Sequence, residues 1–215
     1  MDPSLYVILD RAAARGRDLE AILEAVIAGG GRTVQLREKE WPSGRLLPLT
    51  ERLRARCRAA GVTFIVNDRV DLALAVGADG VHLGQDDLPP RATRPLLRPG
   101  MILGRSTHSL AEARQARDDR ADYIAVGSMF ATATKPDFRL VGPDLIRQIR
   151  PETSLPLIGI GGVTPDNVGE VIRAGADGVA VISAVCGAAD PAAATRRFLE
   201  AIRAARDLTT HTRPL

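Results

Sequence analysis

The sequence predicts an α/β fold, a single (β/α)8 barrel of the TIM type. Eight short apolar runs alternate with amphipathic segments along the 215 residues. Eight such units favour a closed barrel of parallel strands over an open doubly wound sheet, which normally needs about five or six strands. Three segments, 76–84, 119–127 and 174–182, also share a pattern in which Ala-Asp precedes a buried strand. An αβ unit that recurs in this way indicates a repeated βα architecture.

The expected strands are short and are bounded by polar residues or glycine. They are residues 5–9, 33–36, 63–66, 80–83, 101–104, 123–126, 157–160 and 178–182. Helix patterns lie between them, with Asp18 and Ser109 as expected N-caps of two helices. We expect the barrel domain to span residues 1–206 and residues 207–215, which lack a pattern, to form a disordered tail.

Composition narrows the class of protein. Hydrophobic residues make up 45% of the chain but aromatic residues only 3%, which predicts the aliphatic core that parallel sheets favour. Cys57 and Cys186 show no metal-site or CxxC spacing, so we interpret them as buried apolar residues in a reducing compartment. The chain has no apolar run near the ~20 residues of a membrane span and no signal-peptide pattern. We therefore expect a cytoplasmic protein without a membrane partner.

The net charge of +3 and the pI near 9.3 raise the question of nucleic-acid binding. The arginines, however, are spread over predicted helix faces among acidic residues, and aromatic side chains for base stacking are scarce. Solvated helix faces explain the charge better, and we expect no nucleic-acid partner. The sequence does not determine the oligomeric state, and a homo-oligomer stays open.

Lysine is rare in this chain. Of the 29 basic residues, only Lys39 and Lys135 are lysines, in a sequence strongly biased toward arginine. A lysine that persists against such a bias suits a site that needs a compact point charge, such as a tight phosphate pocket. Chance is the alternative explanation, and the placement of these residues bears on it.

Chemically distinctive residues gather after the predicted strands, where barrels of this type build their active face. These residues are Gln35, Arg37, Lys39, Asn67, Asp68, Asp87, Ser106, His108, Thr132, Thr134, Lys135, Gly162 and Ser183. Both lysines are among them. His108 is a candidate acid or base, although a lone histidine in a loop is more often structural, and His82 is expected to pack or hydrogen-bond inside the barrel.

Asp68 and Asp87 end neighbouring strands, whose axes lie ~5 Å apart in a sheet. Two carboxylates at that spacing suit Mg²⁺, which also leaves positions for phosphate oxygens. The alternative is that each aspartate only caps the helix that follows it.

Arg37, Lys39 and Lys135 add three cations near the expected ion. Mg²⁺ together with cations can hold a diphosphate and stabilise it as a leaving group. The alternative is surface ion pairing, for example with Glu38 and Asp137.

A second phosphate site is predicted on the other side of the mouth. Gly162 after the seventh strand and Ser183 after the eighth match the usual monophosphate site of such barrels. Thr132, Thr134 and Lys135 lie close together in one loop and form a candidate anion cradle.

These motifs resemble the thiamine phosphate synthase family over about residues 5–206. The segments that carry the resemblance are QLREK at 35–39, the stretch at 67–87, GRSTH at 104–108, TATKPD at 132–137, GIGGV at 159–163 and GVAVIS at 178–183. The resemblance implies a Mg²⁺-dependent transferase that joins hydroxymethylpyrimidine diphosphate to a thiazole phosphate, giving thiamine phosphate and diphosphate. The diphosphate would leave first, and the thiazole nitrogen would capture the pyrimidine carbocation.

The resemblance also implies a role for each matching residue. The pyrimidine diphosphate would be held by Gln35, Arg37, Lys39, Asn67, Ser106 and Lys135, of which Arg37, Lys39, Ser106 and Lys135 would act in catalysis. Asp68 and Asp87 would bind Mg²⁺. The thiazole phosphate would contact Thr132, Thr134, Gly162, Ile182 and Ser183.

Two features depart from the family pattern or admit another function. Ser128 and Ala131 stand where the family usually has prolines. The GRSTHSL stretch also resembles the related thiazole tautomerases, isomerases on the same barrel that typically lack the paired aspartates and the TxTK lysine. In such an isomerase His108 would shuttle a proton. A non-catalytic barrel that only binds a phosphorylated ligand is the other alternative.

Overall fold

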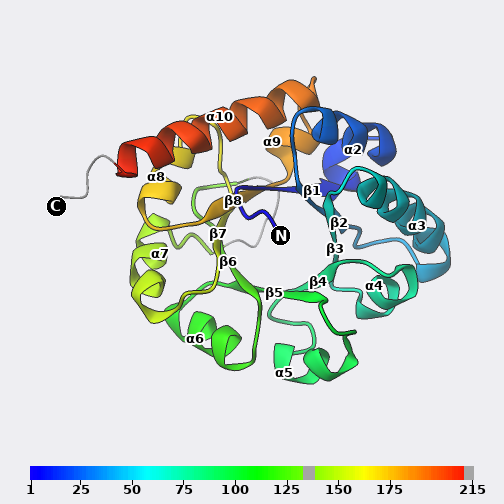
Figure 1. Ribbon diagram of the computed structural model, residues 1–215, viewed down its shortest axis with the longest axis horizontal. Coiled ribbons are helices and arrows are strands. Elements are labelled where there is room, and N and C mark those ends of the chain that lie inside the picture. Colours follow the sequence, from blue (N-terminus) through cyan, green and yellow to red (C-terminus); the bar gives the residue numbers. More distant parts are fainter. Residues whose placement is uncertain (133–138, 211–215) are drawn as a thin grey trace.

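The computed structural model describes residues 1–132 and 139–210, with the backbone alone at 209–210. Eight parallel strands form a closed barrel in sequence order, which confirms the predicted fold class (Figure 1). The strands are β1 (Leu5–Asp10), β2 (Thr33–Arg37), β3 (Thr63–Asn67), β4 (Gly80–Leu83), β5 (Ile102–Thr107), β6 (Tyr123–Gly127), β7 (Leu157–Ile160) and β8 (Gly178–Val181).

Helices surround this barrel on all sides in Figure 1. They are α1 (Arg11–Ala14), α2 (Leu19–Ala28), α3 (Ser43–Ala59), α4 (Val70–Val76), α5 (Pro90–Thr93), α6 (Leu110–Asp118), α7 (Pro143–Ile149), α8 (Val168–Arg173), α9 (Ser183–Cys186) and α10 (Pro191–Thr210), with the 3₁₀ turns η1 (Arg94–Leu96) and η2 (Arg150–Glu152). The side chains of Asp18 and Ser109 accept backbone hydrogen bonds at the starts of α2 and α6, so both predicted caps are confirmed.

The last helix joins the two ends of the chain. α10 packs between α2 and α8 along the outer rim of the barrel. It continues to Thr210 and so passes residue 206, where the sequence led us to end the barrel domain. The remainder of the expected tail, residues 211–215, lies outside the described residues.

β5 is longer than the sequence predicted. Its expected end was residue 104, but the pairing with β6 continues through Arg105, Ser106 and Thr107. Ser106 therefore lies within the strand, opposite Ala125, instead of in the loop after it. A strand residue is held by its backbone ladder, so its side chain has a more fixed direction than one in a loop.

The strands separate two apolar cores. Alternate residues such as Val7 and Leu9 face outward and join the large core between the barrel and the helices. Tyr6 and Ile8 belong to a smaller cluster inside the barrel. Because both faces of each strand are covered, the strands are apolar along almost their whole length.

The repeated Ala-Asp pattern has a physical function at the amino ends of the strands. Asp79, Asp122 and Asp177 each precede a strand, and each accepts the backbone N–H of a residue on the neighbouring strand, at 2.8, 2.7 and 2.8 Å. Those N–H groups belong to Phe64, Leu103 and Leu157. Arg54, Arg94 and Arg150 pair with the three carboxylates in the same order. This aspartate clamp joins β3 to β4, β5 to β6 and β7 to β8.

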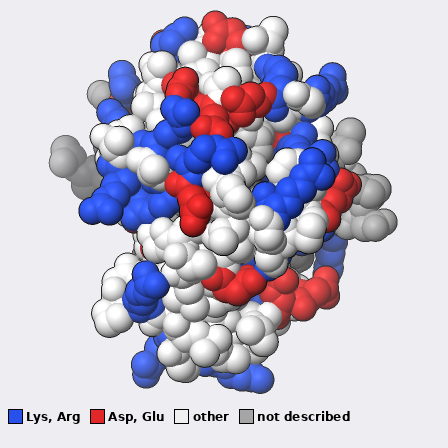
Figure 2. Space-filling view, turned by 90° about the vertical axis from the view of Figure 1, so that its right-hand side faces the viewer, with Lys and Arg blue, Asp and Glu red and all other residues white. Residues whose placement is uncertain are grey.

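Charges on the outer surface are mixed. On the face in Figure 2, Lys and Arg side chains lie among Asp and Glu. Arg52 and Arg56 on α3, for example, pair with Glu20 on α2. Within residues 1–132 and 139–210, no helix is both long enough and apolar enough to cross a bilayer.

Candidate functional site

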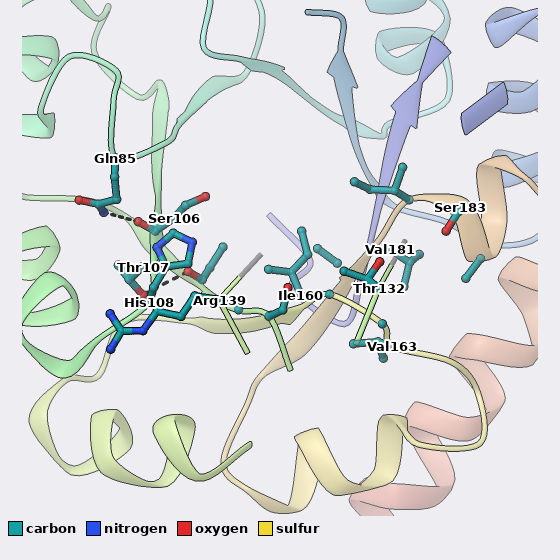
Figure 3. A pocket seen from close by; sticks show the side chains of 18 of the residues that line it. Gln85, Ser106, Thr107, His108, Thr132, Arg139, Ile160, Val163, Val181 and Ser183 are labelled. Atoms are coloured by element: carbon teal, nitrogen blue, oxygen red, sulfur yellow. Dashed lines mark hydrogen bonds between the residues drawn. The ribbon is translucent and has the colours of Figure 1, made fainter. Parts of the chain in front are cut away.

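A cavity of about 420 Å³ opens at the carboxyl ends of β5 to β8 (Figure 3). Its size lies within the range of small-molecule sites. Five of the predicted site residues line it, namely Ser106, Thr132, Gly162, Ile182 and Ser183. The sequence therefore predicted correctly that these positions converge, although they come from four different strand ends.

Two glycines after β7 line the side of the cavity where the sequence predicts a monophosphate site. Gly161 and Gly162 have φ values of 98° and 64°, which side chains disfavour. A Cβ on Gly162 would lie 2.4 Å from the carbonyl oxygen of Ala131, and one on Gly161 would lie 2.4 Å from Ser128 Oγ. The chain after β6 thus packs directly on the glycine backbone, and Phe130 N donates to Gly161 O at 2.9 Å.

Ser183 is the first residue of α9 and follows Ile182 at the end of β8. In Figure 3 Ser183 and Thr132 lie on the same side of the cavity. The opposite end of α9 is held by Arg17, whose guanidinium donates to the carbonyl of Cys186 and, at 2.6 Å, to that of Ala188. This contact fixes the short helix that carries Ser183.

A second group of predicted residues gathers at the ends of β2, β3 and β4. The ammonium of Lys39 pairs with the carboxylate of Asp68. Asp68 adopts a left-handed backbone with φ 60°, and its N–H donates to His82 O at 2.8 Å. A non-glycine residue in this conformation stores about 1–3 kcal/mol of strain, and such residues cluster at functional sites. The strained turn directs the Asp68 side chain toward the loop after β4.

Asp87 lies in that loop. Its Oδ2 accepts the N–H of Gly84 at 2.7 Å. Burial is the main cause that raises the pKa of the Asp87 carboxyl, and a side-chain contact with Asp68 raises it further. The two carboxyl groups are therefore neighbours, as the sequence predicted. The alternative that they cap helices is wrong, because Arg69 and Pro89 precede the first residues of α4 and α5.

Arg37, at the end of β2, pairs with Asp10 at the end of β1. Asp10 is buried, and its other carboxylate oxygen accepts Ala13 N at 2.9 Å. Glu38, which the sequence offered as an ion-pair partner for these cations, pairs with Arg11 instead. Sequence reasoning missed Asp10, and the signal for it was a carboxylate at the end of an otherwise apolar strand.

Two further predicted residues are linked through the barrel interior. Gln35 is buried, and its Nε2 donates to the hydroxyl of Tyr6 at 2.7 Å. Ser106 Oγ lies 2.8 Å from Nε2 of His82. His82 is buried and hydrogen-bonded inside the barrel, which confirms its predicted role. Asn67, the last residue of β3, is half-buried.

Thr134 and Lys135 lie outside the described residues, so the predicted anion cradle is represented in the structure by Thr132 alone. Gln85, His108 and Arg139 are among the other residues that line the cavity, and the sequence predicted no substrate contact for any of the three. Gln85 donates to the carbonyl of Ser106 at 2.5 Å, and His108 Nδ1 lies 3.2 Å from Glu112 Oε2. In Figure 3 the side chains of His108 and Arg139 lie beside each other at one end of the cavity. Sequence reasoning missed Arg139, because it lies two residues beyond the TATKPD motif and belongs to no motif itself.

The donor set suits a hard divalent cation. Asp68 and Asp87 offer carboxylate oxygens, and Mg²⁺ is commonly held by one or two carboxylates with phosphate oxygens and water completing its octahedron. Burial and the closeness of Asp68 raise the pKa of Asp87, and a cation between the two carboxyl groups would favour its ionised form. Across the described residues, no group of three or more His, Cys, Asp or Glu side chains forms a complete protein cage for a metal. The residues fit Mg²⁺ with a phosphorylated substrate better than a structural metal.

A closed (β/α)8 barrel, with a ligand cavity at the carboxyl ends of its strands and a carboxyl group of raised pKa, that of Asp87, in the loop after β4, is the architecture of a barrel enzyme. The chain belongs to the family described as thiamine monophosphate synthase, whose pattern matches residues 5–185.

Named relatives agree with this assignment. The thiamine-phosphate synthase of Moorella thermoacetica is 51% identical over 203 residues, covering 94% of this chain and 97% of the relative. That of Chloroflexus aurantiacus is 49% identical, covering 92% of each chain. The solved structure of thiamine phosphate pyrophosphorylase from Pyrococcus furiosus is 38% identical, with a TM-score of 0.86 over 95% of this chain and 97% of the other.

Proposed function

We propose that this chain is a Mg²⁺-dependent transferase that condenses hydroxymethylpyrimidine diphosphate with a thiazole phosphate, giving thiamine phosphate and diphosphate. Kinship with named thiamine-phosphate synthases supports the reaction. The observation that carries the proposal is the meeting of Lys39, Asp68 and Asp87 beside a cavity that ends at Gly162 and Ser183.

The two halves of the site match two phosphorylated substrates. The group at β2 to β4 is charged and suits the diphosphate, whereas the cavity at β6 to β8 offers hydroxyls and glycine backbone for a monophosphate. Ser106 lies on β5, between the two groups of strands in the barrel order, and Gln35 lies on β2; the pyrimidine ring would bind beside these two residues.

In the proposed reaction the C–O bond between the pyrimidine methylene and the diphosphate breaks, and the bonding electrons leave with the diphosphate. The thiazole nitrogen then supplies its lone pair to the carbocation and forms the new C–N bond. No strong base is needed for either step. Arg37, Lys39 and Lys135 would stabilise the departing diphosphate by their positive charge.

Asp68 and Asp87 would hold Mg²⁺, which supplies further positive charge to the diphosphate oxygens when bound. The side chain of Lys39 is 53% exposed, so it can turn from Asp68 toward a phosphate. A cytoplasmic location is part of this proposal. The two buried free thiols of Cys57 and Cys186 suit such a reducing compartment.

The test is an assay with both phosphorylated substrates, before and after removal of divalent metal with EDTA. We expect diphosphate release to stop with EDTA and to return with Mg²⁺. Turnover that continued undiminished in EDTA would contradict the mechanism. Tight binding of both substrates without turnover in saturating Mg²⁺ would instead indicate a binding protein.

One observation favours a second candidate, a thiazole isomerase. His108 lines the cavity, and Glu112 lies beside its Nδ1, as in a histidine held for proton transfer. This candidate predicts conversion of the thiazole phosphate alone, without Mg²⁺ or pyrimidine diphosphate. Isomerisation that His108→Asn abolishes would support it, and condensation that survives His108→Asn would separate the two activities.

A further inference from the structure

A continuous chain of hydrogen bonds crosses the inside of the barrel from Gln35 to Ser106. Gln35 Nε2 donates to Tyr6 Oη at 2.7 Å, and Tyr6 Oη lies 3.0 Å from Tyr123 Oη. Tyr123 Oη lies 2.8 Å from His82 Nδ1, and His82 Nε2 lies 2.8 Å from Ser106 Oγ. These hydrogen bonds join Gln35 and Ser106, for which the sequence predicts substrate contacts, through Tyr6, Tyr123 and His82, for which it predicts none.

The rings in this chain are closely packed. Tyr6 and Tyr123 meet edge to face with centroids 5.8 Å apart, and Tyr123 stacks on His82 at 5.5 Å. Tyr123 reaches His82 by crossing Gly104, which lies between them in register on β5. A Cβ on Gly104 would lie 2.1 Å from Tyr123 Cζ, so only glycine leaves room for this crossing.

The donor-to-acceptor direction of these hydrogen bonds follows from Gln35, the first residue in the series. The side-chain amide nitrogen of Gln35 can only donate, so Tyr6 Oη accepts there. Each phenol has one proton, and burial raises the pKa of both Tyr6 and Tyr123, which keeps them protonated. Among the described residues, the hydrogen-bond partners of Tyr6 Oη are Gln35 and Tyr123, so its proton must point to Tyr123.

Each later step is then determined. Tyr123 accepts from Tyr6 and donates its own proton to His82 Nδ1. A neutral His82 therefore carries its hydrogen on Nε2 and donates it to Ser106 Oγ. The hydroxyl proton of Ser106, which lines the cavity, is left to point at a ligand. In the reverse direction the Tyr6 proton would be buried without an acceptor, which is strongly unfavourable.

We propose that this series of hydrogen bonds is a one-way relay that fixes the tautomer of His82. It presents the Ser106 hydroxyl as a donor to an acceptor atom of the substrate. Tyr6, Tyr123 and His82 are then positioning residues. The acceptor is a ring nitrogen or a phosphate oxygen. The part that concerns substrate rests on the proposed function, whereas the direction of the relay does not.

The direct test is ¹⁵N NMR of histidine-labelled protein without substrate. The chain has three histidines, and variants of His108 and His211 assign the other two signals. We expect His82 to be the Nε2–H tautomer. The Nδ1–H tautomer in the unmodified protein would overturn the proposal.

Gln35→Glu tests whether the amide sets the direction. An ionised carboxylate only accepts, so it would draw the Tyr6 proton and reverse every later bond. We expect His82 to switch to the Nδ1–H tautomer as the pH rises and the new carboxyl ionises. A His82 signal that stayed Nε2–H up to pH 10 would overturn the assignment of direction.

Tyr123→Phe and Ser106→Ala form a matched pair. Tyr123→Phe removes the donor to His82, so we expect a mixture of tautomers and a KM for the pyrimidine diphosphate raised about 3- to 10-fold, the size of one neutral hydrogen bond. Ser106→Ala should raise that KM while His82 remains Nε2–H. An unmixed Nε2–H tautomer in Tyr123→Phe would contradict the relay.

The two proposals can fail separately. An Nε2–H tautomer in a protein without condensation activity would leave the relay intact and refute the transferase. An active transferase whose His82 is the Nδ1–H tautomer would support the transferase and refute the relay.

Discussion

The side chain of Asp68, directly after β3, contacts the carboxyl group of Asp87 in the loop after β4, and both burial and this contact raise the pKa of Asp87. A carboxyl whose pKa is raised by folding favours the folded state while it is protonated. That contribution is present below the pKa of the unfolded chain and is lost as the pH rises through the folded pKa. Ionisation of Asp87 is therefore unfavourable in the metal-free fold, and a cation bound between the two carboxyl groups would relieve that cost.

Asp87→Asn should stabilise the metal-free protein at pH 7 and abolish Mg²⁺-dependent activity. The asparagine keeps an oxygen that can accept Gly84 N but removes the charge near Asp68. Thermal unfolding without metal is the measurement, and the gain in Tm should disappear at pH values below the carboxyl's ordinary pKa. Mg²⁺ should raise the Tm of the unmodified protein more than that of the variant. A lower Tm for the variant at pH 7 would show that the pair is not repulsive.

Lys39→Ala should lower kcat by roughly 10²-fold, the effect of losing one preorganised electrostatic stabiliser. The same change should tighten binding of Mg²⁺ alone, because Lys39 occupies Asp68 in the structure and competes with the cation. Steady-state kinetics and calorimetric titration of Mg²⁺ measure the two effects. Arg52→Ala, which removes a cation paired with Glu20 on the outer surface, is the control and should change neither. A nearly normal kcat for Lys39→Ala would mean that Lys39 is only a surface charge and does not stabilise the leaving diphosphate.

Gly104→Ala should destabilise the fold by about 1–3 kcal/mol, because the added methyl group overlaps the Tyr123 ring and forces the interior to shift. Urea unfolding measures the loss. Gly44 is the second residue of α3, where an added Cβ would meet only open space, so Gly44→Ala should not lower stability. Equal effects of the two substitutions would mean that the interior tolerates the extra volume.

Asp122→Ala should lower stability by about 1–3 kcal/mol, since Leu103 N loses its acceptor inside the fold. Neither KM should change, because the clamp lies at the amino ends of the strands, away from the cavity. The comparison is Asp118→Ala, which removes an exposed pair with the adjacent Arg117 and should have little effect. A raised KM in Asp122→Ala would indicate that the two ends of the barrel are coupled.

The sequence predicted the barrel because each strand is an apolar run set off by glycine or polar residues, and that signal is local. It also predicted that Asp68, Asp87 and Lys39 meet, because parallel strands bring their carboxyl ends to one edge. The end of β5 was misplaced because Arg105 and Ser106 are polar, although their backbones pair with β6.

The interior relay was outside the reach of sequence patterns. Tyr6 and Tyr123 are the only tyrosines of the chain, and each lies in an apolar strand where its hydroxyl must find a partner. That requirement indicates a buried polar contact, but which residues form it depends on the closure of the barrel. The pairing of Arg37 with Asp10 depends in the same way on the register of β1 and β2.

The clamp formed by Asp79, Asp122 and Asp177 fastens the strands at the rim opposite the cavity. Adaptation to heat and adaptation to a new substrate can thus proceed on opposite rims of one molecule. A library that randomises the loops beyond β6 and β8 can explore altered specificity while these three acids and their arginines keep the scaffold assembled.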